Sequence, residues 1–204
     1  MKRWFSVTLL TMVLGLSGLA NAELIDRGRG LIYDTDLNVT WLQDANYADT
    51  FGINPSTDGA MGWNDAVIFV ENLTYGGYND WRLPYTPGTV WYGYTDEGEL
   101  GHLLTVELGN TLGQTGDFRS GPFINIAYGY YWTSTERNIL EAYHYYMASP
   151  YGNSGFQFSD NKNNGNNVWA VRNGDVTSVP EPATMFLIGS GIIGLWGVRR
   201  KIRK

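Results

Sequence analysis

The chain has 204 residues, contains no cysteine and carries a formal net charge of -6. The absence of cysteine excludes disulfide bonds, thiolate metal sites and a cysteine nucleophile. Residues 23–179 contain 19 acidic and seven basic side chains, and this net charge of -12 argues against nucleic acid or an anionic lipid surface as a partner.

The first 22 residues are typical of a secretory signal peptide. Lys2 and Arg3 precede an apolar run over residues 7–19, and small residues at Ala20 and Ala22 occupy the positions that signal peptidase reads. The apolar run is too short to span a bilayer, which disfavours an N-terminal membrane anchor as the alternative. We therefore expect signal peptidase to cleave after Ala22.

Residues 23–178 are expected to form one α+β domain, with helices early in the chain and antiparallel strands late. Strands are predicted at residues 30–34 and 39–42, joined by an Asp/Asn turn. Amphipathic helices are predicted at residues 58–73 and 99–108. Four further strands are predicted at residues 130–135, 142–148, 155–158 and 168–172.

Three tryptophans in these regular elements are expected in the core: Trp81, Trp132 and Trp169. Two arginines, Arg82 and Arg172, are expected to form structural ion pairs with carboxylates such as Asp80 or Glu99, because basic residues are scarce in an acidic domain.

Aromatic residues gather in two segments that can contact a sugar. The first is a loop after Pro84 that contains Tyr85, Trp91, Tyr92, Tyr94, Asp96 and Glu97. The second contains Tyr143, Tyr145, Tyr146, Tyr151, Asn153 and the Asn-rich run over residues 161–167. Flat rings stack on sugar rings while nearby carboxylates and amides hold hydroxyl groups. The alternative is that these residues pack long loops onto the domain.

No metal site or cofactor is predicted. Asp34, Asp36 and Asn38 have the side chains for a calcium site, but an Asx-rich turn explains them more simply. A catalytic site is not expected either, because the motifs of zinc proteases and serine hydrolases are absent. Asp96 and Glu99 are a candidate carboxylate pair for glycoside hydrolysis, although 19 acidic residues make chance pairs common.

The domain resembles the C-terminal domain of collagen-like adhesins, the Lcl C-terminal domain. The resemblance rests on an ordered set of short elements along the whole domain: residues 30–34, 40–42, 80–84, 99–103, 131–136 and 168–172. It implies a C-type-lectin-like fold, in which the first and last strands pair and a long loop region binds ligands. The chain departs from the family by a longer aromatic insertion after Pro84.

The C-terminal segment, residues 179–204, resembles the PEP-CTERM sorting signal of Gram-negative bacteria, also catalogued as an ice-binding-protein C-terminal region. Pro180, Glu181 and Pro182 precede an apolar stretch over residues 185–198, and a basic tail begins with Arg199 and Arg200. As a helix, residues 183–198 would cover about 24 Å, which is short of a bilayer core. The resemblance implies processing by exosortase near Pro180–Pro182, with a plain membrane tail anchor as the alternative.

Together these features predict a noncatalytic exported protein. Its precursor is expected to be held in the inner membrane by the C-terminal helix and then released to the cell surface or an exopolysaccharide biofilm matrix. There the domain would bind a glycan or another matrix component. The alternatives are an acidic matrix protein with a purely structural role and, less favoured, a glycan hydrolase.

Overall fold

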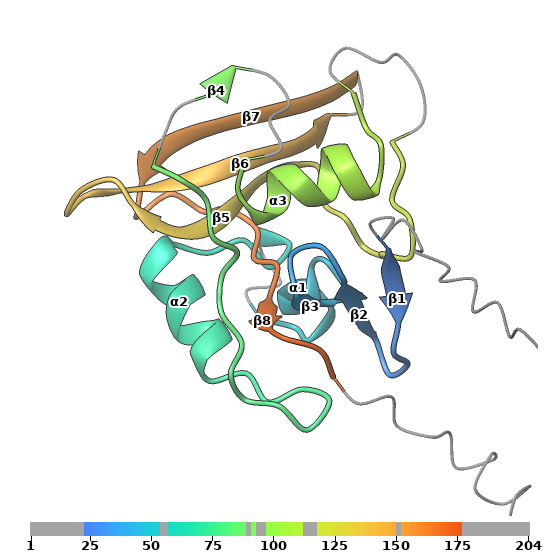
Figure 1. The fold of residues 1–204 in the computed structure, drawn as a ribbon. Helices are drawn as coiled ribbons and strands as arrows, with labels where there is room; N and C mark the ends of the chain where they lie inside the picture. The colour runs from blue at the N-terminus through green and yellow to red at the C-terminus, as the bar shows by residue number, and fades with distance from the viewer. Residues whose placement is uncertain are drawn as a thin grey trace, which may run out of the picture.

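The computed structural model describes residues 23–53, 57–88, 91–92, 97–111, 118–149 and 152–176, with backbone alone at 91–92, 148–149 and 152–154. These residues form a small α+β fold with two antiparallel sheets and short helices (Figure 1). The predicted fold class is therefore confirmed at the level of α+β. The predicted signal peptide and sorting segment lie outside the described residues.

The first sheet joins the two ends of the domain. Its strands lie in the order β1 (Leu24–Asp26), β2 (Leu31–Asp34), β3 (Val39–Leu42) and β8 (Val171–Asn173), and all neighbours are antiparallel. The register places Trp41 opposite Val171, so the last strand pairs with β3 rather than with the edge strand β1. The first strand, β1, was not predicted from the sequence.

The second sheet is formed by the later part of the chain. Its order is β4 (Trp91–Tyr92), β7 (Gly152–Asn161), β6 (Glu141–Ser149) and β5 (Gly129–Glu136), again antiparallel throughout. The strands β5, β6 and β7 were expected, although each is longer than predicted. The edge strand β4 belongs to the segment that was predicted to be a loop.

The helices are shorter than the sequence pattern predicts. They are α1 (Tyr47–Thr50), α2 (Trp63–Glu71) and α3 (Glu99–His102), which continues into the π-helical segment η2 (Leu103–Glu107). The helix α2 begins five residues later than expected because Met61 is held extended by two backbone hydrogen bonds to Asn166, of 3.0 and 3.1 Å. This long-range pairing cannot be read from helical periodicity.

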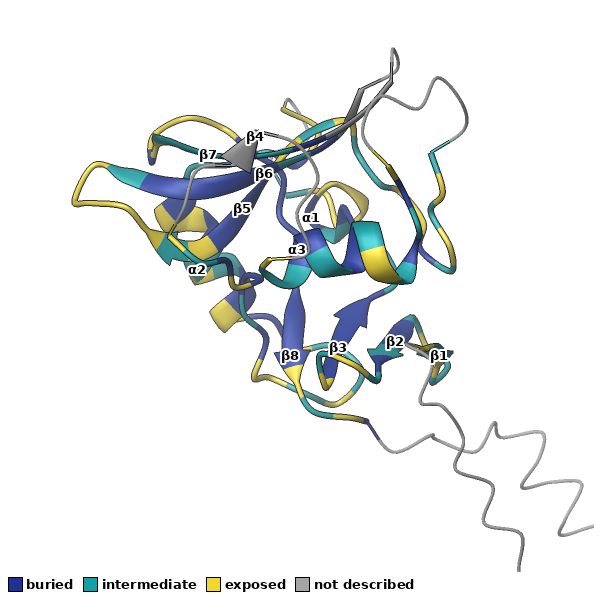
Figure 2. Cartoon of the chain, turned by 45° about the horizontal axis from the view of Figure 1, so that its top comes forward, coloured by how far each residue is buried: buried dark blue, intermediate teal, exposed yellow. Residues whose placement is uncertain are grey.

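The core is built around indole rings whose N–H groups are all satisfied. Trp81, Trp132 and Trp169 are at most 2% exposed, so their predicted burial is confirmed, and Figure 2 shows the buried strands at the centre of the fold. The indole of Trp169 donates to the Leu42 carbonyl oxygen at 2.8 Å, and that of Trp132 donates to the Met61 carbonyl oxygen at 2.8 Å. Large rings can thus fill the core without leaving a buried donor unpaired.

None of the helices in the described ranges has the length and apolar character that crossing a membrane requires. The apolar stretch 185–198 lies outside those ranges.

Candidate functional site: an aromatic sheet face

The second sheet carries a group of rings on one face, which we call the aromatic face: Tyr130, His144, Tyr146, Phe156 and Phe158. The register sets Tyr130 on β5 opposite Tyr146 on β6, and Tyr146 opposite Phe156 on β7. His144 lies opposite Phe158 in the neighbouring row. Directly opposed residues of an antiparallel sheet share a face, so these rings form a continuous surface across three strands.

The rings of the aromatic face are in mutual contact, and all of them except the buried His144 are only partly covered. The ring centroids of Tyr130 and Tyr146 are 4.7 Å apart, and those of Tyr146 and Phe156 are 6.4 Å apart with an angle of 16° between the planes. Tyr130 is 40% exposed, and Tyr146, Phe156 and Phe158 are half-buried. Next to Tyr130 along the chain, Tyr128 is 64% exposed. The face therefore offers solvent-accessible aromatic surface at one end of the sheet.

Polar groups lie beside the rings. The Asp160 carboxylate is half-buried, with Oδ2 3.9 Å from His144 Nδ1. Its Oδ1 accepts a hydrogen bond of 2.7 Å from the side-chain amide of Asn164, an exposed residue of the Asn-rich run. An aromatic platform with a carboxylate and an amide at its edge is the combination by which proteins bind sugars.

His144 is held neutral in this setting. Burial is the largest influence and lowers its pKa from 6.5 to about 4, while the nearby Asp160 carboxylate acts in the opposite direction. The ring stacks on Tyr130 at 4.3 Å, and its Nδ1 lies 3.1 Å from the Asn166 amide nitrogen, which requires an unprotonated acceptor.

This pKa predicts a loss of stability in acid. Between pH 6.5 and about 4 the unfolded chain binds a proton at His144 that the folded protein does not, so acidification lowers the free energy of unfolding. The loss approaches about 3 kcal/mol at the lower end of this window, and the stabilisation is fully present above pH 6.5. Urea unfolding of wild type and His144→Gln at pH 7, 5.5 and 4 measures it. Identical pH dependence in the two proteins would refute the assignment, because glutamine binds no proton.

The predicted contact of Tyr145 with a ligand does not fit the structure. Tyr145 is 1% exposed and Tyr143 is 6% exposed, and the Tyr143 hydroxyl donates to the Gly88 carbonyl oxygen at 2.8 Å. Successive side chains of a strand point to opposite faces, so β6 cannot present both Tyr145 and Tyr146 to one surface. Of the tyrosines predicted on β6, only Tyr146 belongs to the aromatic face.

The other predicted loop residues are described in part. Tyr85 is 55% exposed. Trp91 and Tyr92 form β4, whose register sets Tyr92 opposite Phe156, so the two predicted aromatic segments meet in one sheet. Asn153 lies in β7, where its backbone pairs with Ala148. Tyr94, Asp96 and Tyr151 lie outside the described residues.

The base of this loop is closed by an ion pair. Arg82 donates from Nη1 and Nη2 to the two oxygens of Glu99, both at 2.7 Å, and Glu99 Oε2 also accepts from the Tyr85 backbone N–H. Gly98 has a φ of 75°, and a Cβ at this position would lie 2.7 Å from Thr86 Oγ1. The loop ends are therefore held together where the chain enters α3.

The ion pairs predicted for both arginines are confirmed. Besides the pair Arg82–Glu99, Arg172 donates from Nε and Nη2 to the two oxygens of Asp80, at 2.8 and 2.9 Å. The Arg172 hydrogen bonds hold the pKa of Asp80 below its ordinary value. Arg82 therefore links the segment before the aromatic loop to α3, and Arg172 links the last strand β8 to the middle of the chain.

The predicted Asx-rich turn is also present. Asp34 Oδ1 accepts hydrogen bonds from the backbone N–H groups of Asp36 and Leu37, at 3.1 and 3.0 Å. Asn38 has a φ of 51° and accepts a hydrogen bond from the Tyr33 hydroxyl, which occupies its side-chain oxygen. The three residues considered for calcium therefore build a tight turn between β2 and β3.

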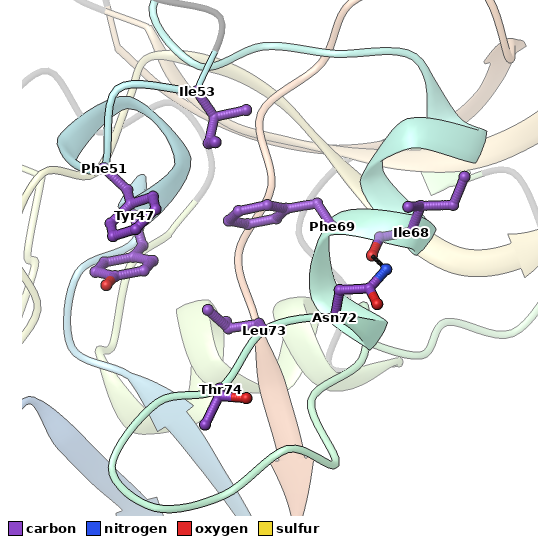
Figure 3. Close-up of a pocket in the computed structure, with 8 residues that line it drawn as sticks. All are labelled: Tyr47, Phe51, Ile53, Ile68, Phe69, Asn72, Leu73 and Thr74. Atoms are coloured by element: carbon purple, nitrogen blue, oxygen red, sulfur yellow. Dashed lines mark hydrogen bonds between the residues drawn. The ribbon is translucent and has the colours of Figure 1, made fainter.

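A separate apolar hollow of about 320 Å³ lies between α1 and α2 (Figure 3). It is lined by Tyr47, Phe51, Ile53, Ile68, Phe69, Asn72, Leu73 and Thr74. Phe51 stacks on Tyr47 at 5.6 Å and is 66% exposed. The Asn72 amide donates to the Ile68 carbonyl oxygen at 2.8 Å, so its nitrogen is engaged within the helix end. Sequence reasoning missed this hollow because its apolar residues read as core positions.

Comparison with known proteins identifies the C-terminal segment. Residues 178–201 match the family described as the PEP-CTERM protein-sorting motif. This motif implies an exported protein that exosortase sorts and processes. The match covers the predicted sorting residues Pro180–Pro182 and Arg199–Arg200, which lie outside the described residues, as does Ala22.

The domain itself has no match. No curated protein and no solved structure matches the chain. The resemblance to the Lcl C-terminal domain and the C-type-lectin-like assignment therefore gain no support and stay predictions.

Proposed function

We propose that this chain is a noncatalytic protein of the cell surface or exopolysaccharide matrix, and that its domain binds a glycan through the aromatic face. The sorting motif at residues 178–201 supports the destination. The observation that carries the binding proposal is the row of contacting rings Tyr130, Tyr146 and Phe156 across three strands. Tyr85 and the undescribed loop residues Tyr94, Asp96 and Tyr151 are further proposed contacts.

The row of rings is wide enough to contact an extended polysaccharide chain. Neighbouring strands lie about 4.8 Å apart, so three strands give a platform of about 10 Å, wide enough for more than one sugar ring. The C–H face of a sugar stacks on aromatic rings, while the Asp160 carboxylate and the Asn164 amide can hold hydroxyl groups. With a net charge of -12 over residues 23–179, the domain favours a neutral or amino-sugar polymer over a strongly anionic one.

Binding is favoured over catalysis by the contacts of Glu99. Both of its carboxylate oxygens accept hydrogen bonds from Arg82, and the side chain is 12% exposed. A carboxylate held in this way serves the structure of the loop base, and its proposed partner in hydrolysis, Asp96, lies outside the described residues. We propose that the domain binds its glycan without calcium, another metal or a cofactor.

Substitution of the exposed ring tests the binding proposal. Tyr130→Ala is expected to weaken binding to the producing bacterium's exopolysaccharide about 5- to 10-fold, because one stacking contact of about 1–1.4 kcal/mol is lost. Affinity electrophoresis of the full chain in gels containing this polysaccharide measures the change. Tyr146→Ala is expected to act in the same direction, with urea unfolding as the check on folding.

Phe51→Ala is the control, because it removes a ring that is more exposed than Tyr130, 66% against 40%, from the hollow between α1 and α2. Its mobility in the gel should equal that of wild type. If Phe51→Ala rather than Tyr130→Ala loses retardation, the ligand binds in the hollow and the proposed site is wrong. If wild type itself shows only salt-sensitive, sugar-independent mobility, the acidic structural role replaces the binding role.

A further inference from the structure

Four polar side chains from separate elements meet beside the first sheet. Asp34 ends β2, Asp36 lies in the following turn, His102 ends α3 and Glu107 ends η2. Potential ligand atoms of Asp34, His102 and Glu107 all lie within 4.8 Å of one another. His102 Nε2 is 3.7 Å from Glu107 Oε1 and 3.8 Å from Asp36 Oδ2. The imidazole nitrogen thus faces carboxylates from two directions.

The π-helical segment brings two of these residues together. His102 and Glu107 are five residues apart, which in an α-helix would place them about 140° apart around the axis. In η2 the Leu108 N–H donates to the Leu103 carbonyl oxygen at 3.0 Å, and this i to i+5 hydrogen bonding brings residues five apart closer together around the axis than an α-helix does. Buried Leu103 and Leu104 fix the segment in the core. Such π-helical turns are frequent at functional sites.

Two atoms of the cluster are buried and have no hydrogen-bond partner among the described residues: His102 Nε2 and Glu107 Oε1. The Glu107 side chain is only 2% exposed, so it lies away from bulk solvent. A buried polar atom without a partner is destabilising, and more so when it is charged. The two atoms lie 3.7 Å apart, so a single ligand could contact both of them.

In the part of the chain that the structure describes, the basic side chain beside these carboxylates is that of His102. Among the described residues, no lysine or arginine forms an ion pair with Asp34, Asp36 or Glu107. Carboxylates buried beside one another require either protons or a cation.

The geometry points to a binding site for one divalent transition-metal ion, with Asp34, His102 and Glu107 as ligands and zinc as the best-fitting metal. Ligand atoms about 2.0–2.1 Å from a tetrahedral zinc ion lie about 3.4 Å apart, close to the 3.7 Å between His102 Nε2 and Glu107 Oε1. The hydrogen bonds from two backbone N–H groups orient the Asp34 carboxylate, as outer-shell partners of metal ligands do. Asp36 contributes a further negative charge at the edge.

The donor set distinguishes zinc from the alkaline-earth cations. Calcium and magnesium bind oxygen ligands, whereas an imidazole nitrogen beside carboxylates suits zinc and related transition metals. The site also differs from the calcium ligands considered in the sequence, because Asn38 does not take part and His102 and Glu107 do. It is independent of the aromatic face and of the glycan-binding proposal.

Calorimetric titration of the full chain, stripped with EDTA and held in mild detergent, tests this site with zinc chloride as the probe. We expect one equivalent of zinc to bind with micromolar or tighter affinity. Glu107→Gln and His102→Gln should each weaken binding at least 10-fold, whereas His144→Gln should bind zinc as wild type does. The thermal midpoint of each variant without metal checks that it is folded, and zinc should raise the midpoint of wild type and not of Glu107→Gln.

The two histidines of the chain allow a direct readout. In ¹⁵N-resolved NMR spectra, zinc should shift the imidazole signals of His102 and leave those of His144 unchanged, and the spectrum of His144→Gln assigns them. Zinc binding without a shift at His102 would overturn the site. The absence of saturable zinc binding would also overturn the site, because protons shared among the carboxylates would then explain the cluster. Calcium binding of equal affinity would overturn it as well, because the cluster would then bind cations through oxygen atoms alone.

Discussion

Replacing Trp169 by alanine is expected to lower the free energy of unfolding by about 3–5 kcal/mol, the range for removal of a large buried ring. Trp169 is fully buried, and its ring lies 5.4 Å from that of Trp41 and 4.9 Å from that of Phe123. Its indole N–H also donates a hydrogen bond to the carbonyl oxygen of Leu42, the last residue of β3 in the first sheet. The loss therefore combines a cavity with an unpaired acceptor.

Urea unfolding of the full chain measures this change. Tyr128→Ala is the matched control, because this ring is 64% exposed and its removal should change stability by less than about 0.5 kcal/mol. A loss below about 1 kcal/mol in Trp169→Ala would contradict the placement of this ring at the centre of the core.

Breaking the ion pair between Arg82 and Glu99 is expected to have the second-largest effect. Arg82→Gln should cost about 2–4 kcal/mol, because Glu99 keeps a largely buried carboxylate that has lost its bidentate partner. The same carboxylate holds the Tyr85 backbone, so the base of the aromatic loop should open and become sensitive to protease.

A double-mutant cycle isolates this interaction. Glu99→Gln in the Arg82→Gln background should cost less than in wild type, with a coupling of about 1–3 kcal/mol from urea unfolding. Arg137→Gln, which breaks an exposed pair with Glu141, is the control and should cost less than about 1 kcal/mol. Coupling no larger than that of the exposed pair would show that Arg82 does not hold the loop.

The features that the sequence predicts correctly are those with a local cause. Burial of Trp132 and Trp169 follows from large rings in strand-like contexts, and the partners of Arg82 and Arg172 follow from the scarcity of bases in an acidic domain. The Asx turn after Asp34 follows from side chains that hydrogen-bond their own backbone.

The features that it misses depend on contacts between distant segments. The late start of α2 results from pairing between Met61 and Asn166, 105 positions along the chain. The aromatic face needs the register of β5, β6 and β7, which decides that Tyr146 and not Tyr145 joins Tyr130. The meeting of His102 and Glu107 needs a π-helical segment, and helical periodicity alone separates these residues.

The aromatic face and the sorting motif both agree with the proposed role. The motif implies export and processing, and the domain presents contacting rings beside polar groups, as a polysaccharide-binding surface does. Within residues 23–176, the ion pair Arg82–Glu99 closes the base of the aromatic loop, and the ion pair Arg172–Asp80 ties the last strand of the first sheet to the middle of the chain. The proposed zinc site would add stability without taking part in glycan contact.

The most direct test of the proposed function is calorimetric titration of the full chain with exopolysaccharide fragments from the producing bacterium, with and without EDTA. We predict saturable binding heat, with the same affinity for the fragments in both buffers. Tyr130→Ala should lower this affinity about 5- to 10-fold. A flat trace in both buffers, or heat that Tyr130→Ala leaves unchanged, would contradict glycan binding by the aromatic face.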